Sequence, residues 1–298
     1  MLNRILWATD GSKDSFAAFN YAELLAKNFK ADIHGLAVIP EDYKFFDTFS
    51  PQEKKKLENS LKETLELKEI NRLEEVKKKL KQNNLHFSYS IAKGIAPMEI
   101  ITAAECENVD LVVMGKGRSV DKFTLGGTVI KVLRNCTIPI LTARENGMRT
   151  AIKKILVPVD LSHGLTANFD YAIGLSKIFN AELHLANIVE TSEHEFPDEL
   201  MEKIKSNTKM ELGYRLKRSN VAENIRIYVE SARNAFIGIT DLARENDIDL
   251  IVMMTYGGTV FKEEFIGSIA WKVIQESSVP VITLTPHKSI LKMTGNAK

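Results

Sequence analysis

The sequence contains the same series of landmarks twice, and this internal repeat limits the possible folds more than any other feature. Three segments of the first half return in the second half in the same order: 5–12 at 155–162, 31–34 at 181–184 and 109–114 at 248–253. Each half also closes on a short apolar run that contains a proline, at 138–141 and 279–282. A repeat of about half the chain length indicates two copies of one domain, not a solenoid of short units.

The length of the chain agrees with two domains. Its 298 residues suffice for two units of ordinary size, each of which can bury a core. We expect domain 1 at 1–144 and domain 2 at 152–286, joined by a polar linker around 144–154.

Composition excludes several classes of function. The formal net charge is +1, with 44% hydrophobic and 27% charged residues, as in a soluble globular protein. This balance favours neither nucleic-acid nor membrane binding. No run approaches the ~18 apolar residues of a membrane span, and the N-terminus carries no signal-peptide pattern. The two cysteines, Cys106 and Cys136, form no framework, which is typical of a cytoplasmic protein.

Short apolar runs alternate with helical patterns in both halves. This alternation predicts an α/β fold in which each half has a five-stranded parallel sheet, covered on both faces and connected by right-handed crossovers. The expected strands are 5–9, 33–39, 86–91, 111–114 and 139–143, and in the second half about 155–159, 182–188, 225–229, 250–254 and 280–284. A long helix over 51–84 is expected to carry a solvated, charged face.

Ligands of such sheets bind beyond the carboxyl ends of the strands, where the strand order switches. That rule points to the loops after Thr9, Val38 and Met114. The third loop contains several glycines and leads into a helix. Glycines allow backbone N–H groups to approach a phosphate, and a helix N-terminus favours negative charge. The third loop is therefore the candidate phosphate site.

These residues resemble the universal stress protein A family, whose hallmark is a G-x-x-G-x9-G-[ST] loop in a five-stranded α/β sheet. The openings at 5–10 and 155–160, the step at 94–97, the strand at 109–114 and the closing strands carry the resemblance. It covers nearly the whole chain twice, so the chain resembles a tandem universal stress protein with a Rossmann-like fold of the adenine-nucleotide alpha-hydrolase type. Family members with the complete loop bind ATP, whereas others do not.

The first loop departs from this pattern, because Gly115 and Gly117 are one position closer than in the family. Counting nine residues from Gly117 places the terminal glycine at Gly127. Aligning Pro139 with Pro280 places it at Gly126 instead. We favour the alignment on the prolines, which implies a loop shortened by two residues. A deletion inside the helix would instead rotate its buried face by about 100°.

The second loop keeps the spacing but changes the chemistry. Gly257 is followed by nine residues and then by Gly267, as in the family. However, Met254 stands at the first glycine position, where a side chain would crowd a phosphate. Glu263 and Glu264 add negative charge.

By resemblance, an adenine nucleotide such as ATP, with Mg²⁺ as a candidate companion, would bind domain 1. The implied residues are Ala8, Thr9, Asp10, Val38, Met114, Gly115, Gly117, Gly126, Gly127 and Thr128. A weaker second site would use Pro158, Val159, Asp160, Ile188, Gly257, Gly267 and Ser268. Asp10 is a candidate to hydrogen-bond the ribose or to hold a metal that bridges the phosphates. The alternatives are that both aspartates only cap the following helices, and that the glycine loops are tight turns without a ligand.

Two hypotheses for the function remain. The first is a cytoplasmic stress-response regulator that binds ATP or a related nucleotide in domain 1, with domain 2 degenerate. The alternative is a stress-related scaffold or interaction protein without a nucleotide. No nucleophile with an identifiable base and no metal-ligand set is found, so catalysis is not predicted beyond slow ATP hydrolysis. Protein partners are not identified, although a second copy of the tandem chain is a candidate.

The tandem arrangement also predicts how the halves associate. By resemblance, they should form an intramolecular pseudo-dimer in which the closing strands meet edge to edge, since this covers two exposed sheet edges at once. The surroundings of Thr142 and Val281 should then be buried.

Overall fold

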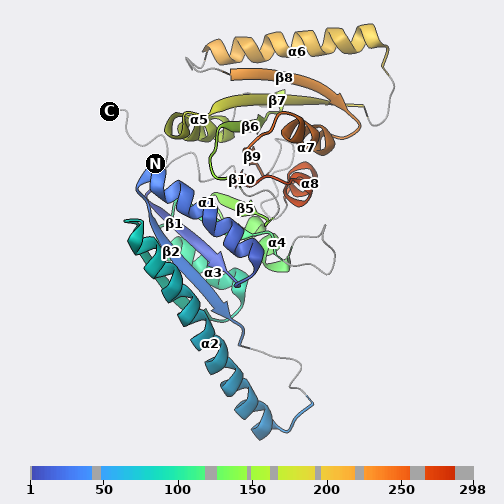
Figure 1. Cartoon of the computed structure of the whole chain (residues 1–298). Helices are drawn as coiled ribbons and strands as arrows, with labels where there is room; N and C mark the ends of the chain where they lie inside the picture. The colour runs from blue at the N-terminus through green and yellow to red at the C-terminus, as the bar shows by residue number, and fades with distance from the viewer. Residues whose placement is uncertain are drawn as a thin grey trace.

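The computed structural model describes residues 2–41, 48–117, 126–145, 149–161, 167–191, 196–218, 225–255 and 266–285. The first half contains the strands β1 (Arg4–Thr9), β2 (Asp32–Ile39), β3 (Phe87–Lys93), β4 (Leu111–Gly115) and β5 (Ile140–Ala143). The second half contains β6 (Lys154–Pro158), β7 (Glu182–Glu190), β8 (Ile225–Ala232), β9 (Leu250–Met254) and β10 (Val281–Leu284). The expected alternation of strands and helices is confirmed in both halves (Figure 1).

The helices follow the same repeated order. Those of the first half are α1 (Lys13–Phe29), α2 (Pro51–Gln82), α3 (Ala96–Cys106) and α4 (Gly127–Asn135). Those of the second half are α5 (Ala167–Phe179), α6 (Asp198–Arg218), α7 (Ala235–Glu245) and α8 (Ser268–Glu276). None of the described helices is long and apolar enough to cross a membrane.

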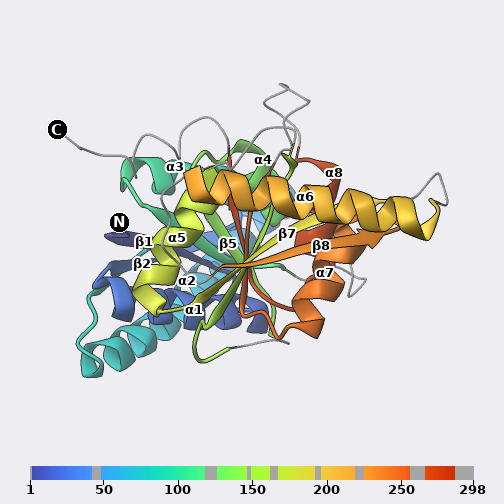
Figure 2. The same ribbon diagram turned by 90° about the horizontal axis from the view of Figure 1, so that it is seen from above.

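All strands in the described part of the chain belong to one ten-stranded sheet in the order β3-β2-β1-β4-β5-β10-β9-β6-β7-β8. Neighbours within each half are parallel, and β5 and β10 pair antiparallel at the centre. Viewed from above, the strands of both halves fan about a common centre, as expected from the accumulated twist of a single sheet (Figure 2). The predicted edge-to-edge pseudo-dimer is therefore confirmed.

The central pairing is fully buried. Val281 lies opposite Thr142 in the register, and both side chains are 0% exposed. The Thr142 hydroxyl donates to the Val281 carbonyl at 3.5 Å, and the Thr283 hydroxyl donates to the Ile140 carbonyl at 3.3 Å. The hydroxyls of this apolar seam therefore have partners in the opposite half, as buried polar groups require.

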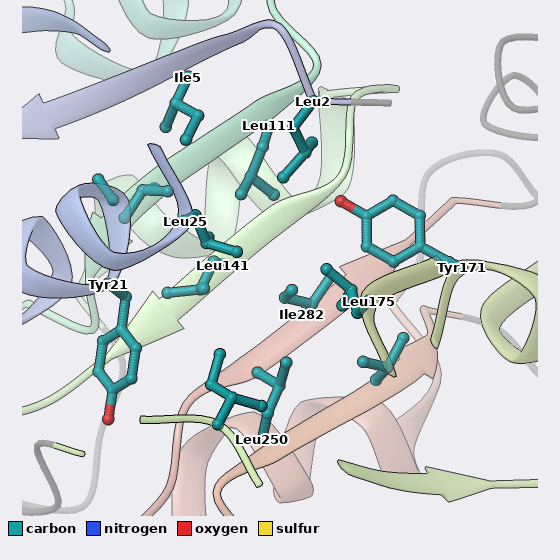
Figure 3. Close-up of a cluster of buried hydrophobic side chains, with 14 of the residues drawn as sticks. Leu2, Ile5, Tyr21, Leu25, Leu111, Leu141, Tyr171, Leu175, Leu250 and Ile282 are labelled. Atoms are coloured by element: carbon teal, nitrogen blue, oxygen red, sulfur yellow. The ribbon is translucent and has the colours of Figure 1, made fainter. Parts of the chain in front are cut away.

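Two apolar cores, one on each face of the sheet, run through both halves. The core beneath α1, α2, α5 and α6 includes Leu141 and Ile282, which lie together with Leu175 and Leu250 across the seam (Figure 3). The opposite core, beneath α3, α4, α7 and α8, likewise combines residues of both halves. On the first face, α1 also meets α5 through Phe29 and Phe179, whose ring centroids are 6.2 Å apart.

The expected long helix is present as α2, which extends beyond the sheet (Figure 1). It begins with a capping box in which the Ser50 hydroxyl accepts from the Glu53 N–H and the Glu53 carboxylate accepts from the Ser50 N–H. Its buried side chains, Leu73, Val76 and Leu80, all lie in the C-terminal part, where the helix packs on the sheet.

We expect the two halves to unfold in a single cooperative transition, because both cores cross the seam. Leu141→Ala should lower the free energy of unfolding by about 2–5 kcal/mol, since Leu141 is fully buried. Leu67→Ala is the control: Leu67 is 60% exposed on α2, so its effect should stay within about 0.5 kcal/mol. Urea unfolding and scanning calorimetry measure both. Two separate transitions, only one of them shifted by Leu141→Ala, would contradict this expectation.

Candidate functional site

The predicted residues of β1, β2 and β4 come together at the carboxyl edge of the sheet in domain 1. Ala8 pairs in register with Met114 on β4, and Thr9 pairs with Ala37 on β2, one residue before Val38. β1 is flanked by β2 on one side and β4 on the other, so this edge is where the strand order switches. Ala8 and Met114 are buried, whereas Val38 is half-buried.

The turn between β1 and α1 is held by its own side chains. The Ser12 N–H donates to Asp10 Oδ1 at 2.9 Å, and Ser12 itself caps α1 by accepting from the Ser15 N–H at 3.2 Å. Gly11 has a φ of +68°, which favours glycine. Asp10 is therefore not the N-cap of α1, contrary to the alternative considered from the sequence. Its exposed carboxylate shapes the turn and faces solvent at the candidate site.

An arginine that the sequence did not point to also reaches this turn. A Cβ on Gly11 would overlap the guanidinium of Arg72 from α2. Glu69 holds that guanidinium, with both carboxylate oxygens 2.7 Å from Arg72 Nη1. No sequence motif marked the contact, because it depends on how α2 lies across the sheet.

The glycines of the third loop serve different physical purposes. A Cβ on Gly115 would lie 2.5 Å from the backbone N of Ser15, so this glycine allows β4 to pack closely on the first turn of α1. Gly117 has a φ of +80°, and its Cβ would lie 3.2 Å from the Cα of Gly126. Only at Gly127, among these glycines, would a Cβ meet nothing within 4 Å.

The N-terminus of α4 has the features of an anion site. Gly126 is its N-cap and no side chain caps the helix, while Gly127 is exposed and Thr128 is half-buried. The first N–H groups of a helix have no partner within the helix, and its dipole favours negative charge there. The free space at Gly127 lets a phosphate approach these groups.

Equivalent hydrogen bonds in the two halves settle which glycines correspond. The Gly126 N–H donates to the Lys116 carbonyl at 3.0 Å, and the Gly267 N–H donates to the Thr255 carbonyl at 2.8 Å. Gly126 thus matches Gly267, as the alignment on the prolines predicted, and the first loop is two residues shorter. The residues between, which include Gly257 and the charged residues of both loops, lie outside the described ranges.

At the second site, asparagine side chains bind the backbone of the strand end. Asn168 Nδ2 donates to the Pro158 carbonyl at 3.1 Å, and Asn187 Nδ2 donates to the Val159 carbonyl at 3.0 Å. Asp160 follows as an exposed residue, and Ile188 lies close enough to Gly238 that a Cβ there would come within 2.7 Å.

In the second half, a methionine replaces the glycine at the end of the fourth strand. Met254 occupies the position of Gly115, whose missing side chain admits the first turn of α1. The two helices end at equivalent phenylalanines, Phe29 and Phe179, and residues 162–166 before α5 lie outside the described ranges. A side chain at this position would collide with a helical turn packed as in domain 1.

Lys116 occupies the loop between the two glycines, yet it points away from the site. Its side chain is 0% exposed, and Nζ donates to the Ser277 carbonyl of domain 2 at 2.8 Å. Burial lowers the pKa of Lys116 to about 7; Arg144 lowers it further, whereas Asp14 and Glu276 act in the opposite direction. A lysine between two glycines of a phosphate loop would ordinarily suggest a ligand contact, so the sequence alone did not reveal this role.

Metal binding by the protein alone finds no support in the described residues. No group of three or more His, Cys, Asp or Glu side chains in those ranges is arranged to hold an ion.

Comparison with known proteins places these features in a family. The profile described as "Universal stress protein family" matches residues 1–144 and again 151–284. Universal stress protein MJ0577 of Methanocaldococcus jannaschii is 30% identical over 157 residues, which cover 49% of this chain and 96% of that protein. Universal stress protein MJ0531 of the same organism is 28% identical over 142 residues, which cover 46% and 84%.

Solved structures resemble the whole tandem chain. A universal stress protein from Archaeoglobus fulgidus gives a TM-score of 0.68 at 22% identity, covering 96% of this chain and 97% of that one. A putative universal stress protein from Pseudomonas aeruginosa gives 0.66 at 17% identity, with coverage of 98% and 96%. At these identities the likeness concerns the fold.

Two alanine substitutions test the different purposes of the glycines. Gly115→Ala should lower the free energy of unfolding by about 1–3 kcal/mol, because the new methyl group would collide with the backbone of α1. Gly127→Ala should leave stability unchanged or raise it by up to about 1 kcal/mol, since it adds a helix former in free space. Urea titration of both variants gives the comparison. Equal destabilisation by the two would contradict this assignment.

Proposed function

The chain belongs to the universal stress protein family, and from this premise we propose that it is a cytoplasmic stress-response regulator whose domain 1 binds ATP or a related adenine nucleotide. One observation carries the proposal: the N-terminus of α4 has no capping side chain, and Gly127 borders free space. The helix α4 follows the loop after β4, and β4 lies beside β1 where the strand order switches.

Each part of the nucleotide has a proposed place. The adenine lies between residues 8–10 and Val38, and the phosphates lie over the backbone of Gly117, Gly126 and Gly127. Asp10 hydrogen-bonds the ribose or holds a Mg²⁺ that the phosphates share. The exposed carboxylate of Asp10 and the uncapped amides of α4 have the opposite polarities that this arrangement needs.

Domain 2 is proposed to lack the nucleotide. Met254 fills the place of Gly115, and asparagine side chains already bind the carbonyls of Pro158 and Val159. The domain limits are proposed as 1–144 and 152–286, with one nucleotide per chain. The alternative, an interaction protein without a nucleotide, is favoured by the two-residue shortening of the first loop.

A matched pair of variants distinguishes these possibilities. Gly127 and Ser268 are the first residues of α4 and α8, and both are exposed. Glutamate is favourable in the first turn of a helix, so Gly127→Glu and Ser268→Glu should both fold. Gly127→Glu should weaken ATP binding at least about tenfold, because its carboxylate would repel the phosphates. Ser268→Glu should leave the affinity unchanged.

Isothermal titration calorimetry with ATP and Mg²⁺ measures both variants against the natural protein, with one site per chain expected. If the natural protein shows no binding at millimolar ATP, the nucleotide proposal fails and the interaction protein is favoured. If Ser268→Glu weakens binding as much as Gly127→Glu, then the choice of domain 1 is wrong.

A further inference from the structure

Lys116 fixes one corner of the domain 1 loop through three contacts. Its backbone N–H donates to the Ala143 carbonyl at 2.9 Å, and its carbonyl accepts from the Gly126 N–H at 3.0 Å. Its Nζ donates to the Ser277 carbonyl at 2.8 Å, across the boundary between the domains. A single residue thus joins the start of the loop, the N-cap of α4 and the opposite domain.

The contact in domain 2 lies at a helix end that leads directly to the second loop. Ser277 is the C-cap of α8, and Gly267 is the N-cap of the same nine-residue helix. The C-terminus of a helix carries partial negative charge, which favours a cation. Lys116 therefore links the start of the predicted phosphate loop of domain 1 to α8, and α8 begins at the end of the corresponding loop of domain 2.

The equivalent contacts of the domain 2 loop and of the end of α4 use different groups. Thr255 matches Lys116, but its hydroxyl donates to the Leu284 carbonyl within domain 2 at 3.2 Å. The carbonyl of Cys136, the counterpart of Ser277, accepts instead from the Thr285 hydroxyl at 3.3 Å. In the described residues, this seam therefore carries an ammonium on one side and hydroxyls on the other.

We propose that Lys116 is a positioning residue that couples the nucleotide loop of domain 1 to α8 of domain 2, and that this coupling follows the protonation of its ammonium. The part that concerns the nucleotide rests on the proposed function, whereas the connection to α8 does not. The groups whose charge acts on the ammonium are Arg144 at the end of β5, Asp14 on α1 and Glu276 on α8.

Burial of this ammonium opposes folding, which argues against a purely structural role. The ordinary lysine pKa is 10.5, whereas the folded value is about 7. Between these values the unfolded chain binds more protons than the folded chain, so stability contributed at this residue rises with pH across that window. At neutral pH both the charged and the neutral forms are populated, and the contact with Ser277 can respond to small changes in pH.

The first test needs no nucleotide and uses the full chain. Trp7 and Trp271 are the two tryptophans, and Trp271 lies on α8. In protein labelled with 5-fluorotryptophan, the ¹⁹F resonance of Trp271, assigned with Trp271→Phe, should titrate between pH 6 and 8.5. This titration should be lost in Lys116→Met and kept in Lys153→Met, which removes an exposed lysine just before β6.

Lys116→Arg serves as a second variant, because arginine stays charged throughout this range and should abolish the titration even if the methionine variant folds poorly. A titration of Trp271 that persists unchanged in Lys116→Met or Lys116→Arg would overturn the proposal.

The second test adds ATP and Mg²⁺. Binding to the natural protein should shift the Trp271 resonance, and Gly127→Glu should abolish that shift. Lys116→Met should abolish it too, while weakening affinity by about 5-fold or more, a typical coupling between sites. An unchanged Trp271 response in Lys116→Met would overturn the coupling. Absence of any binding to the natural protein would sink the proposed function instead, and the titration without nucleotide would still decide the role of Lys116.

Discussion

The antiparallel pairing of β5 with β10 is the constraint on which the rest of the molecule depends. Each half alone would expose the edge of a strand whose side chains are apolar, and such an edge invites association with other chains. Joining the two edges removes both at once and makes the two cores continuous across the seam (Figure 3). The same pairing brings the loop after β4 next to the end of α8. The contact of Lys116 with Ser277 exists only because the sheet is shared.

Within this shared sheet, the two halves differ where a missing side chain decides the packing. Gly115 admits the first turn of α1, and that turn carries the Ser12 cap and the Asp10 hydrogen bond of the candidate site. Met254 occupies the equivalent position in the second half. The strands of the two halves keep the same order, because their buried residues are apolar in both halves.

Much of this architecture could be predicted from the sequence, since apolar runs and their repetition indicate the strands and helices of both halves, while the shared edge followed from the resemblance to the family and from the need to cover exposed strand edges. The equivalence of Gly126 and Gly267 was also predictable, because a helix tolerates a deletion less easily than a loop. Contacts between segments that are distant in the sequence could not be predicted. Lys116 and Ser277 are 161 positions apart, and their meeting depends on the register across the seam. Whether Asp10 or Ser12 caps α1 was not predictable either, because both are good capping residues and only the turn geometry selects Ser12.

Duplication followed by unequal change has a physical consequence for regulation. In a symmetric pair, each loop would contact the other domain in the same way, and a ligand in one site would meet an identical partner. Here the seam has an ammonium on one side and a hydroxyl at the matching position, so the two domains do not contact each other in the same way. Linkage still requires a single coupling free energy for both directions. If the state of domain 2 changes the affinity of the domain 1 site, a ligand at that site shifts the state of domain 2 by the same free energy. In the proposed coupling, the asymmetry therefore lies in which domain holds the ligand and which one holds the responding helix.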